Sequence, residues 1–212
     1  MNDDPSGGWE AVAAKFSAMR SDVGADVVKR WSRRVRPGGS ILDIGCGAGR
    51  PIATTLLDEG FDLYGIDPSP TLLAAFRRNL PGAEAACEAA EVSRLFDRRF
   101  DGAVAIGVMF LLSKDGQRAV IERVGRALTP GGHFLFSAPR QPCCWKDTLT
   151  GRLSLSLARS DTVDCSSARG CASSMATSTR EQTFIFMPIE HRTNWAGTYT
   201  PRAKIWPANA GV

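Results

Sequence analysis

The 212-residue sequence has no hydrophobic run approaching the length of about 20 residues that a membrane-spanning helix needs. Residues 1–5 are acidic and lack the basic and apolar segments of a secretory signal peptide. These two absences predict a cytoplasmic protein without membrane contact. In that compartment we expect the cysteines to be thiols, namely Cys46, Cys87, Cys143, Cys144, Cys165 and Cys171.

The sequence also lacks cysteine or histidine pairs with the spacing of a metal site. Histidine occurs only at His133 and His191, and no two cysteines have the C-x-x-C spacing of a zinc site. The pair Cys143–Cys144 is adjacent, which does not suit two ligands of one ion. The sequence therefore predicts no metal centre.

The excess of positive over negative charge is also moderate. The net charge is +4, and the one dense basic cluster lies at residues 29–36. Such a cluster is usually a solvated helix face, with contact to RNA as the alternative interpretation. A hydrophobic content of 43% and a charged content of 23% are ordinary for a globular chain. We expect one α/β domain and no nucleic-acid partner.

Apolar periodicity predicts strands and helices that alternate along most of the chain. Strands are expected near 40–44, 62–66, 83–87, 100–107 and 133–136, each pair separated by a helical or loop segment. This rhythm is typical of a doubly wound, mostly parallel sheet flanked by helices. A helical stripe at Trp9, Phe16 and Met19 precedes the first strand. That helix either packs on the core or covers a ligand.

The most informative segment runs from Ile41 to Gly49 and reads as a buried strand, a glycine-rich turn and the start of a helix. A second buried strand ends at Asp67. Parallel strands deliver their carboxyl ends to one edge of the sheet, where nucleoside cofactors bind. Glycine lets the backbone approach such a ligand, and the carboxylate can accept hydrogen bonds from both ribose hydroxyls.

Glycine spacing separates two cofactor classes. The dinucleotide fingerprint G-x-G-x-x-G would require glycine at position 50, which is Arg50. The run Asp43-x-Gly45-x-Gly47-x-Gly49 instead resembles motif I of class I S-adenosylmethionine (SAM)-dependent methyltransferases. The resemblance extends from about Trp9 to Leu157. Within these residues the chain is similar to bacterial methyltransferases that act on small molecules. It implies a Rossmann-like fold and SAM as the cofactor.

The resemblance also assigns roles to residues at the strand ends. Asp67 would bind the ribose, and Asp43 would sense the ammonium group of SAM. Adenine would lie near the residues after the third strand, where Ala90 and Glu91 rank ahead of Glu88. The expected cofactor-binding residues are Asp43, Gly45, Cys46, Gly47, Asp67, Pro68, Ala90, Glu91 and Ile106. No side chain stands out as a catalytic base, so the catalytic residues stay unassigned.

Three segments are expected: N-terminal helices at 1–39, a SAM-binding core at 40–157, and an atypical, disordered tail at 158–212. Members of the family need a further helix and an antiparallel hairpin after the fifth strand, and neither is recognisable in the tail. Shifting the reading frame near Leu157 lets synonymous codons spell such a helix and hairpin. We therefore interpret the tail as frame-shifted, with a natural diverged tail as the alternative.

The resulting prediction is an enzyme that transfers a methyl group from SAM to O, N or C of a small-molecule acceptor. An impaired or inactive frame-shifted remnant is the first alternative. An oxidoreductase with a nucleotide cofactor is a minor one, opposed by Arg50. The acceptor, its reacting atom and the oligomeric state do not follow from the sequence.

Overall fold

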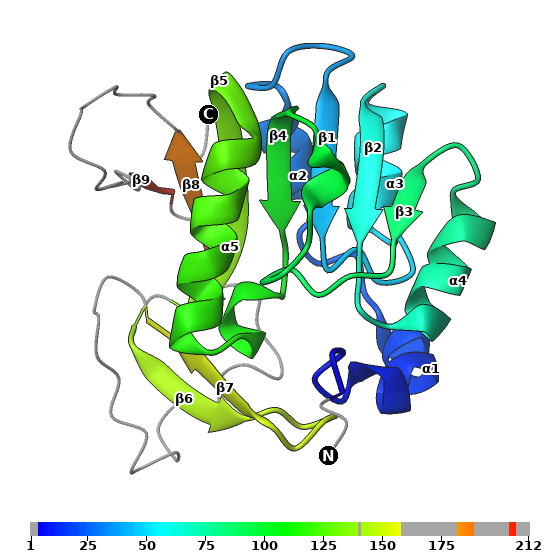
Figure 1. Ribbon diagram of the computed structural model, residues 1–212, viewed down its shortest axis with the longest axis vertical. Coiled ribbons are helices and arrows are strands. Elements are labelled where there is room, and N and C mark those ends of the chain that lie inside the picture. The colour runs from blue at the N-terminus through cyan, green and yellow to red at the C-terminus, as the bar shows by residue number, and fades with distance from the viewer. Residues whose placement is uncertain (1–3, 140, 158–181, 189–203, 207–212) are drawn as a thin grey trace.

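The computed structural model describes residues 4–139, 141–157, 182–188 and 204–206. Its main sheet has the strand order β3-β2-β1-β4-β5-β8-β9, and β6 and β7 form a separate two-stranded sheet (Figure 1). The strands are β1 (Ser40–Ile44), β2 (Asp62–Ile66), β3 (Glu84–Ala86), β4 (Phe100–Ala105), β5 (Leu128–Pro139), β6 (Cys143–Lys146), β7 (Leu153–Ser156), β8 (Gln182–Pro188) and β9 (Lys204–Trp206). The α-helices are α1 (Trp9–Met19), α2 (Ala25–Ser32), α3 (Ile52–Asp58), α4 (Pro70–Asn79) and α5 (Lys114–Ala127), with short 3-10 turns η1 (Leu95–Asp97) and η2 (Met109–Leu111).

The first five strands run parallel, as the sequence predicts. β1 pairs with β2 on one side and with β4 on the other, and β3 and β5 extend the sheet outward. Every residue of β1 is buried because helices cover both faces of the sheet. A strand buried on both faces needs apolar residues at consecutive positions, which explains the run Ile41-Leu42 before Asp43.

Two apolar clusters fill the spaces between the sheet and its helices. On one face α2, α3 and α4 pack their apolar residues, including Val28, Leu56 and Phe76, against the sheet. On the other face α5 contributes Val120 and Val124 to the second cluster. The predicted doubly wound α/β fold is therefore confirmed.

Local sequence explains where α4 and α5 begin. Ser69 precedes α4, and its hydroxyl accepts a hydrogen bond from the Leu72 backbone N–H at 3.2 Å, as expected of an N-cap. Ser113 plays the same part for α5, accepting from Gly116 N at 3.0 Å. Each cap satisfies a helical N–H group that would otherwise lack a partner.

One expectation about the tail is wrong. The antiparallel strands expected to be missing beside the fifth strand are present, because β8 pairs antiparallel with β5 and β9 pairs with β8. The apolar run Phe184–Met187 in the sequence is the signal for β8. The edge of β5 is thereby paired. The expectations for 158–181, 189–203 and 207–212, including the missing helix, lie outside the described residues.

The carboxyl ends of the parallel strands gather at one edge of the sheet, where Figure 1 shows α1 on one side and the β6–β7 hairpin on the other. No helix in the described part of the chain is long and apolar enough to span a membrane. Cys46 and Cys87 are thiols. The expectation of thiols is wrong for Cys144, which is disulfide-bonded.

Candidate functional site

The glycine-rich turn after β1 is bonded directly to the end of β2. Gly45 and Gly47 have positive φ angles of 66° and 54°, a conformation that residues with a side chain rarely adopt. The backbone N–H groups of Gly45 and Cys46 both donate to the Ile66 carbonyl, at 2.8 and 3.1 Å. The ends of the two strands are therefore fixed to each other before any side chain is considered.

Position 45 is also crowded by the segment that follows β4. A Cβ atom placed on Gly45 would lie 2.3 Å from Cγ2 of Val108, which is far too close. Glycine is thus required here for both its φ angle and its lack of a side chain. The carboxyl ends of β1, β2 and β4 consequently meet at one point.

Asp67 joins this point from the end of β2. Its Oδ2 accepts a hydrogen bond from the Gly47 backbone N–H, and its Oδ1 accepts one from the Ser69 N–H, each at 2.9 Å. The side chain is buried, and burial raises its pKa while the two backbone donors oppose that rise. Each carboxylate oxygen keeps a further lone pair that can accept from a ligand hydroxyl. The predicted meeting of residue 67 with the glycine turn is observed.

Asp43, at the carboxyl-terminal half of β1, has a different environment. The residue is only 2% exposed, and its Oδ2 has no hydrogen-bond partner among the described residues. Burial raises the pKa of its carboxyl group to about 8, with Arg20 lowering it and Asp67 raising it further. A buried acceptor without a donor is costly, and a ligand that donates hydrogen bonds would remove that cost.

Cys46 is part of the turn, and its thiol donates to the Gly47 carbonyl at 3.9 Å. Burial raises the pKa of its thiol well above the ordinary value, with the charges of Asp43 and Asp67 adding to the effect. Its sulfur occupies the space beside Gly65, where a Cβ atom would lie 2.8 Å from it. Cys46 is a neutral filler packed against β2.

Helix α1 lies over the carboxyl edge rather than inside the core. Ala13 is its one buried residue, and the Phe16 ring lies 3.7 Å from the position that a Cβ atom on Gly47 would take. The carboxylate of Glu10 accepts hydrogen bonds from the Ser69 hydroxyl and from the Thr71 backbone N–H. These contacts hold α1 against the start of α4, next to Asp67. Of the two roles left open by the sequence, the position of α1 suits a cover for the site.

The segment after β3 is brought to the same edge. The Asp67 backbone N–H donates to the Ala86 carbonyl at 3.3 Å, and the Cys87 thiol contacts the Pro68 carbonyl at 3.8 Å. Ala90 is buried in the core cluster with the α5 residues. This places Pro68 and the residues after β3 within one neighbourhood.

The two acidic candidates for adenine recognition have different surroundings. Glu88 accepts hydrogen bonds from the Ser93 hydroxyl and the Arg94 backbone N–H, at 2.5 and 3.2 Å. The Glu91 carboxylate lies against the first turn of α5, with Oε1 3.3 Å from the position of a Cβ atom on Gly116. None of these contacts brings either side chain to the glycine turn.

The exit of β4 forms the remaining side of the site. Ile106 is buried, while Gly107 has a φ of +80° and open space where a side chain would begin. The Gly107 N–H donates to the hydroxyl of Ser137 at 2.8 Å, and Ser137 is fully buried. Sequence reasoning did not identify Ser137, because a serine inside an apolar strand gives no signal of its partner.

The described residues contain no group of three His, Cys, Asp or Glu side chains suited to a metal ion. The site combines two buried carboxylates, a glycine turn and a segment of open backbone at the end of β4. These are the elements of a receptor for a polar nucleoside ligand.

Comparison with known proteins agrees with this geometry. Residues 41–132 match the family model of a methyltransferase domain. The chain is 34% identical over 113 residues to carboxy-S-adenosyl-L-methionine synthase of Chromohalobacter salexigens, which covers 50% of this chain and 42% of that protein. It is 31% identical over 140 residues to trans-aconitate 2-methyltransferase of Methylobacterium nodulans, covering 62% of this chain and 50% of that protein. The chain thus spans half or less of the length of these relatives.

A solved structure shows the same architecture. The glycopeptide N-methyltransferase MtfA, crystallised with SAM, superposes with a TM-score of 0.51 at 26% identity, covering 65% of this chain and 66% of that one.

Proposed function

We propose that this chain is a class I SAM-dependent methyltransferase that transfers a methyl group from SAM to a small-molecule acceptor. The match of residues 41–132 to a methyltransferase domain and the likeness to MtfA support this proposal. The observation that carries the proposal is the pair of hydrogen bonds from Gly47 and Ser69 to Asp67. These bonds hold a carboxylate at the glycine turn, where the ribose of a nucleoside cofactor would lie.

The residues at this edge suit the separate parts of SAM. Asp67 has acceptor capacity left for both ribose hydroxyls. Asp43 has an oxygen without a donor among the described residues, which suits the ammonium group of the amino-acid end. Gly45 and Gly47 expose backbone beside it, and Pro68, Ala90, Glu91 and Ile106 complete the proposed set around the base and the sulfur. The similar structure of MtfA was solved with SAM, which supports SAM as the ligand of this chain as well.

The chain's own contribution to catalysis is positioning. When bound, SAM would supply a methyl group on a sulfonium, which is a good leaving group for displacement by the acceptor. Bringing two reactants into line can provide much of the rate of such a displacement. Gly107 leaves open space at the end of β4, so an acceptor can approach there without displacing a side chain.

A small metabolite is the proposed acceptor, with O, N or C as the reacting atom. The trans-aconitate 2-methyltransferase relative, by its name, acts on a small organic acid, which supports this class. The carboxyl edge of the sheet lies between α1 and the β6–β7 hairpin (Figure 1). No nucleic acid and no membrane are part of the proposal.

The test is an assay of S-adenosylhomocysteine (SAH) formation from SAM across a library of small metabolites. We expect SAH to form with a subset of acceptors and to fall to background in the Asp67→Ala variant. Failure of the protein to bind SAM at all would contradict the proposal. Binding of SAM without turnover on any acceptor would identify the impaired remnant instead.

A further inference from the structure

Two segments of the chain approach the carboxyl edge of the main sheet from opposite sides. On the β2 side, α1 is anchored by Glu10, whose carboxylate accepts hydrogen bonds from the Ser69 hydroxyl and the Thr71 backbone N–H. Further along α1, the Phe16 ring lies over Gly47 of the glycine turn. This segment is therefore attached next to the proposed ligand site.

The β6–β7 hairpin is the second segment, and it is anchored against α5 and η2. Nε2 of the buried Gln117 on α5 donates hydrogen bonds to the carbonyls of Leu155 and Leu112, at 3.0 and 3.2 Å. The ring centres of Phe110 and Trp145 are 5.3 Å apart. The hairpin is thereby fixed to the segment that follows the end of β4.

The two segments meet through their turns, at residues 4–8 before α1 and residues 147–152 between β6 and β7. A Cβ atom placed on Gly8 would lie 3.3 Å from Nε of Arg152 and 3.6 Å from Cβ of Thr150. Figure 1 shows the N-terminal turn beside this end of the hairpin. We call the contact between the two turns the clasp.

Each turn of the clasp is held together by its own aspartate. Asp4 accepts hydrogen bonds from the backbone N–H groups of Ser6 and Gly8, at 2.9 and 2.7 Å. Asp147 accepts one from the Thr150 backbone N–H at 2.7 Å. These bonds lie within the turns, so each turn would keep its shape if the two moved apart.

Little holds the two turns to each other. No hydrogen bond or ion pair joins them in the described part of the chain. Their contact consists of packing against the Arg152 side chain and of the attraction between the charges of Arg152 and Asp4. Both residues are exposed, and solvent screens an attraction between exposed charges. The clasp should therefore separate more easily than the two anchors.

We propose that the clasp opens to admit and release ligands at the carboxyl edge and closes over them, while the anchors at Ser69 and Gln117 stay bonded. This inference rests on the proposed function, because the ligands concerned are SAM, SAH and the acceptor. A closed clasp would help to exclude water from the site, and its opening would limit the rate at which ligands exchange.

The test closes the clasp with a disulfide bond. The distance of 3.6 Å between the Cβ positions at Gly8 and Thr150 lies within the range that a disulfide spans. The whole chain carrying Gly8→Cys/Thr150→Cys would be loaded with radiolabelled SAH, oxidised, and mixed with excess unlabelled SAH. We expect label to leave the oxidised variant at least about 100-fold more slowly than the reduced variant.

Two controls separate this effect from others. Gly8→Ser/Thr150→Ser introduces side chains of similar size and the same backbone strain but forms no disulfide, so oxidation should leave its release rate unchanged. Wild type is oxidised and reduced in parallel, because Cys144 is disulfide-bonded and reduction acts on that bond too. Mass spectrometry of proteolytic peptides verifies the bond between positions 8 and 150.

A second variant loosens the clasp instead. Arg152→Ala removes the side chain that packs against Gly8, and SAH release should become about 3-fold faster. Lys146→Ala removes an exposed cation from the same hairpin and should release SAH at the wild-type rate. Equal rates in the two alanine variants would contradict the role of the clasp.

The disulfide experiment overturns the proposal in either of two ways. If label leaves the oxidised and reduced variants at the same rate although the disulfide is present, ligands do not pass through the clasp. If the disulfide does not form in the folded protein, the two turns do not lie together as described. If wild type binds no SAH, the proposed function itself fails, and the clasp fails with it.

Discussion

Asp43 and Asp67 lie at the carboxyl ends of adjacent parallel strands, yet their surroundings are opposite. Both are nearly fully buried, at 2% and 6% exposure. Asp67 accepts backbone hydrogen bonds on both oxygens, whereas Oδ2 of Asp43 accepts none from the described residues. The first acid is part of the structure of the turn, and the second is available for a donor that comes from outside.

This difference separates stability from binding. Removing the Asp67 side chain leaves two backbone N–H groups without their acceptor. The stability of the turn and the affinity for a ligand should therefore both fall. Removing the charge of Asp43 leaves no such donor stranded. Its loss should appear in ligand affinity and in pH dependence, while the fold is maintained.

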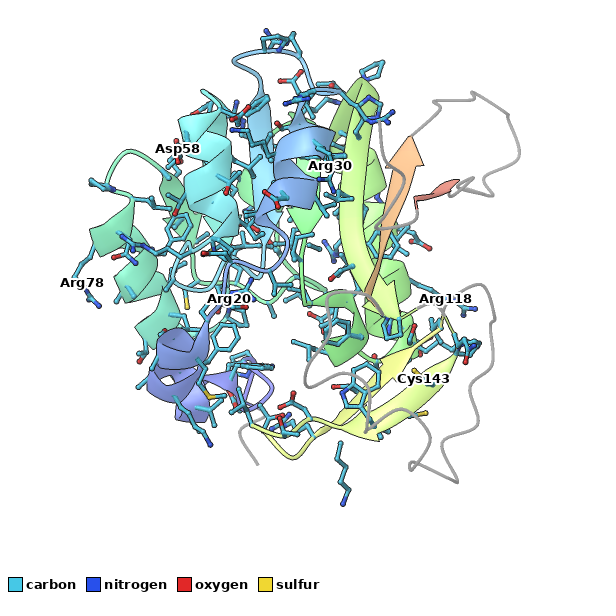
Figure 2. The ribbon with its side chains drawn as sticks, turned by 180° about the vertical axis from the view of Figure 1, so that it is seen from behind. Arg20, Arg30, Asp58, Arg78, Arg118 and Cys143 are labelled. Carbon is cyan, nitrogen blue, oxygen red and sulfur yellow. The ribbon has the colours of Figure 1, made fainter. Side chains whose placement is uncertain are left out.

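The largest effect is expected from Asp67→Ala. Two buried N–H groups lose their acceptor, which should lower the free energy of unfolding by about 3 kcal/mol. SAM affinity should fall at least about 100-fold, because the acceptor of both ribose hydroxyls is also lost. Chemical denaturation and calorimetry measure the two quantities. Asp58→Ala, an exposed acid on α3, is the control (Figure 2), and wild-type affinity in Asp67→Ala would contradict the account.

Gly45→Ala should lower the free energy of unfolding by about 3 kcal/mol, because it adds both a strained φ and an overlap with Val108. Gly60 provides the matched comparison, since its φ is +84° and nothing lies within 4 Å of an added Cβ. Gly60→Ala should cost only about 1 kcal/mol.

The double variant Gly45→Ala/Val108→Ala should recover part of the loss by removing the overlap at 2.3 Å. Equal destabilisation by Gly45→Ala and Gly60→Ala would show that the ends of β1 and β4 are not packed as described.

Asp43→Asn should change the pH dependence of SAM binding. The pKa of Asp43 is raised to about 8, so below that pH the carboxyl group holds a proton that must leave before an ammonium group binds. Wild-type affinity should therefore fall as the pH drops below about 8, by up to about tenfold per pH unit. The variant should bind weakly and show only the titration of the ligand. The same pH profile in both proteins would refute the role of Asp43.

The same raised pKa predicts how stability changes with pH. Below the ordinary Asp pKa of 3.8 both folded and unfolded chains carry the proton on Asp43, and the contribution to stability is complete. As the pH rises from there to about 8, the unfolded chain ionises first, so this contribution is lost. Without ligand, wild type should lose stability relative to Asp43→Asn across that window in thermal melts. A constant difference would contradict the burial of an ionisable carboxyl group.

The smallest effect is expected from Glu10→Gln, which weakens the bonds from α1 to Ser69 and Thr71. Glu10 is a partly exposed residue, and solvent screens such contacts, so SAM affinity should fall by only about 3-fold. Lys15→Gln on the exposed face of α1 is the control. An unchanged affinity in Glu10→Gln would mean that α1 does not help to close the site.

Much of this site could be predicted because its parts follow from strand polarity. A parallel β-α-β unit must bring Gly47 and Asp67 to one edge, whatever the details of the helix between them. The cap at Ser69 is likewise a local feature. The effect of the Arg20 charge on Asp43 could not be predicted, because the position of Arg20 depends on how α1 docks against the sheet. The same holds for Glu91, whose contact with Gly116 joins segments separated by a strand.

The tail was the least predictable region. Phe184–Met187 carries a strand signal, but the partner strand β5 lies far away in the sequence. The frame-shift hypothesis stays a prediction. Sequencing the coding DNA tests it, and codons unable to spell the expected helix and hairpin would refute it.

The most direct measurement of the central claim is a crystal structure of the protein with SAH. The account predicts both ribose hydroxyls within hydrogen-bonding distance of the Asp67 carboxylate, with the ammonium group beside Asp43. A ligand bound at another edge of the sheet, or a ribose turned away from Asp67, would contradict it.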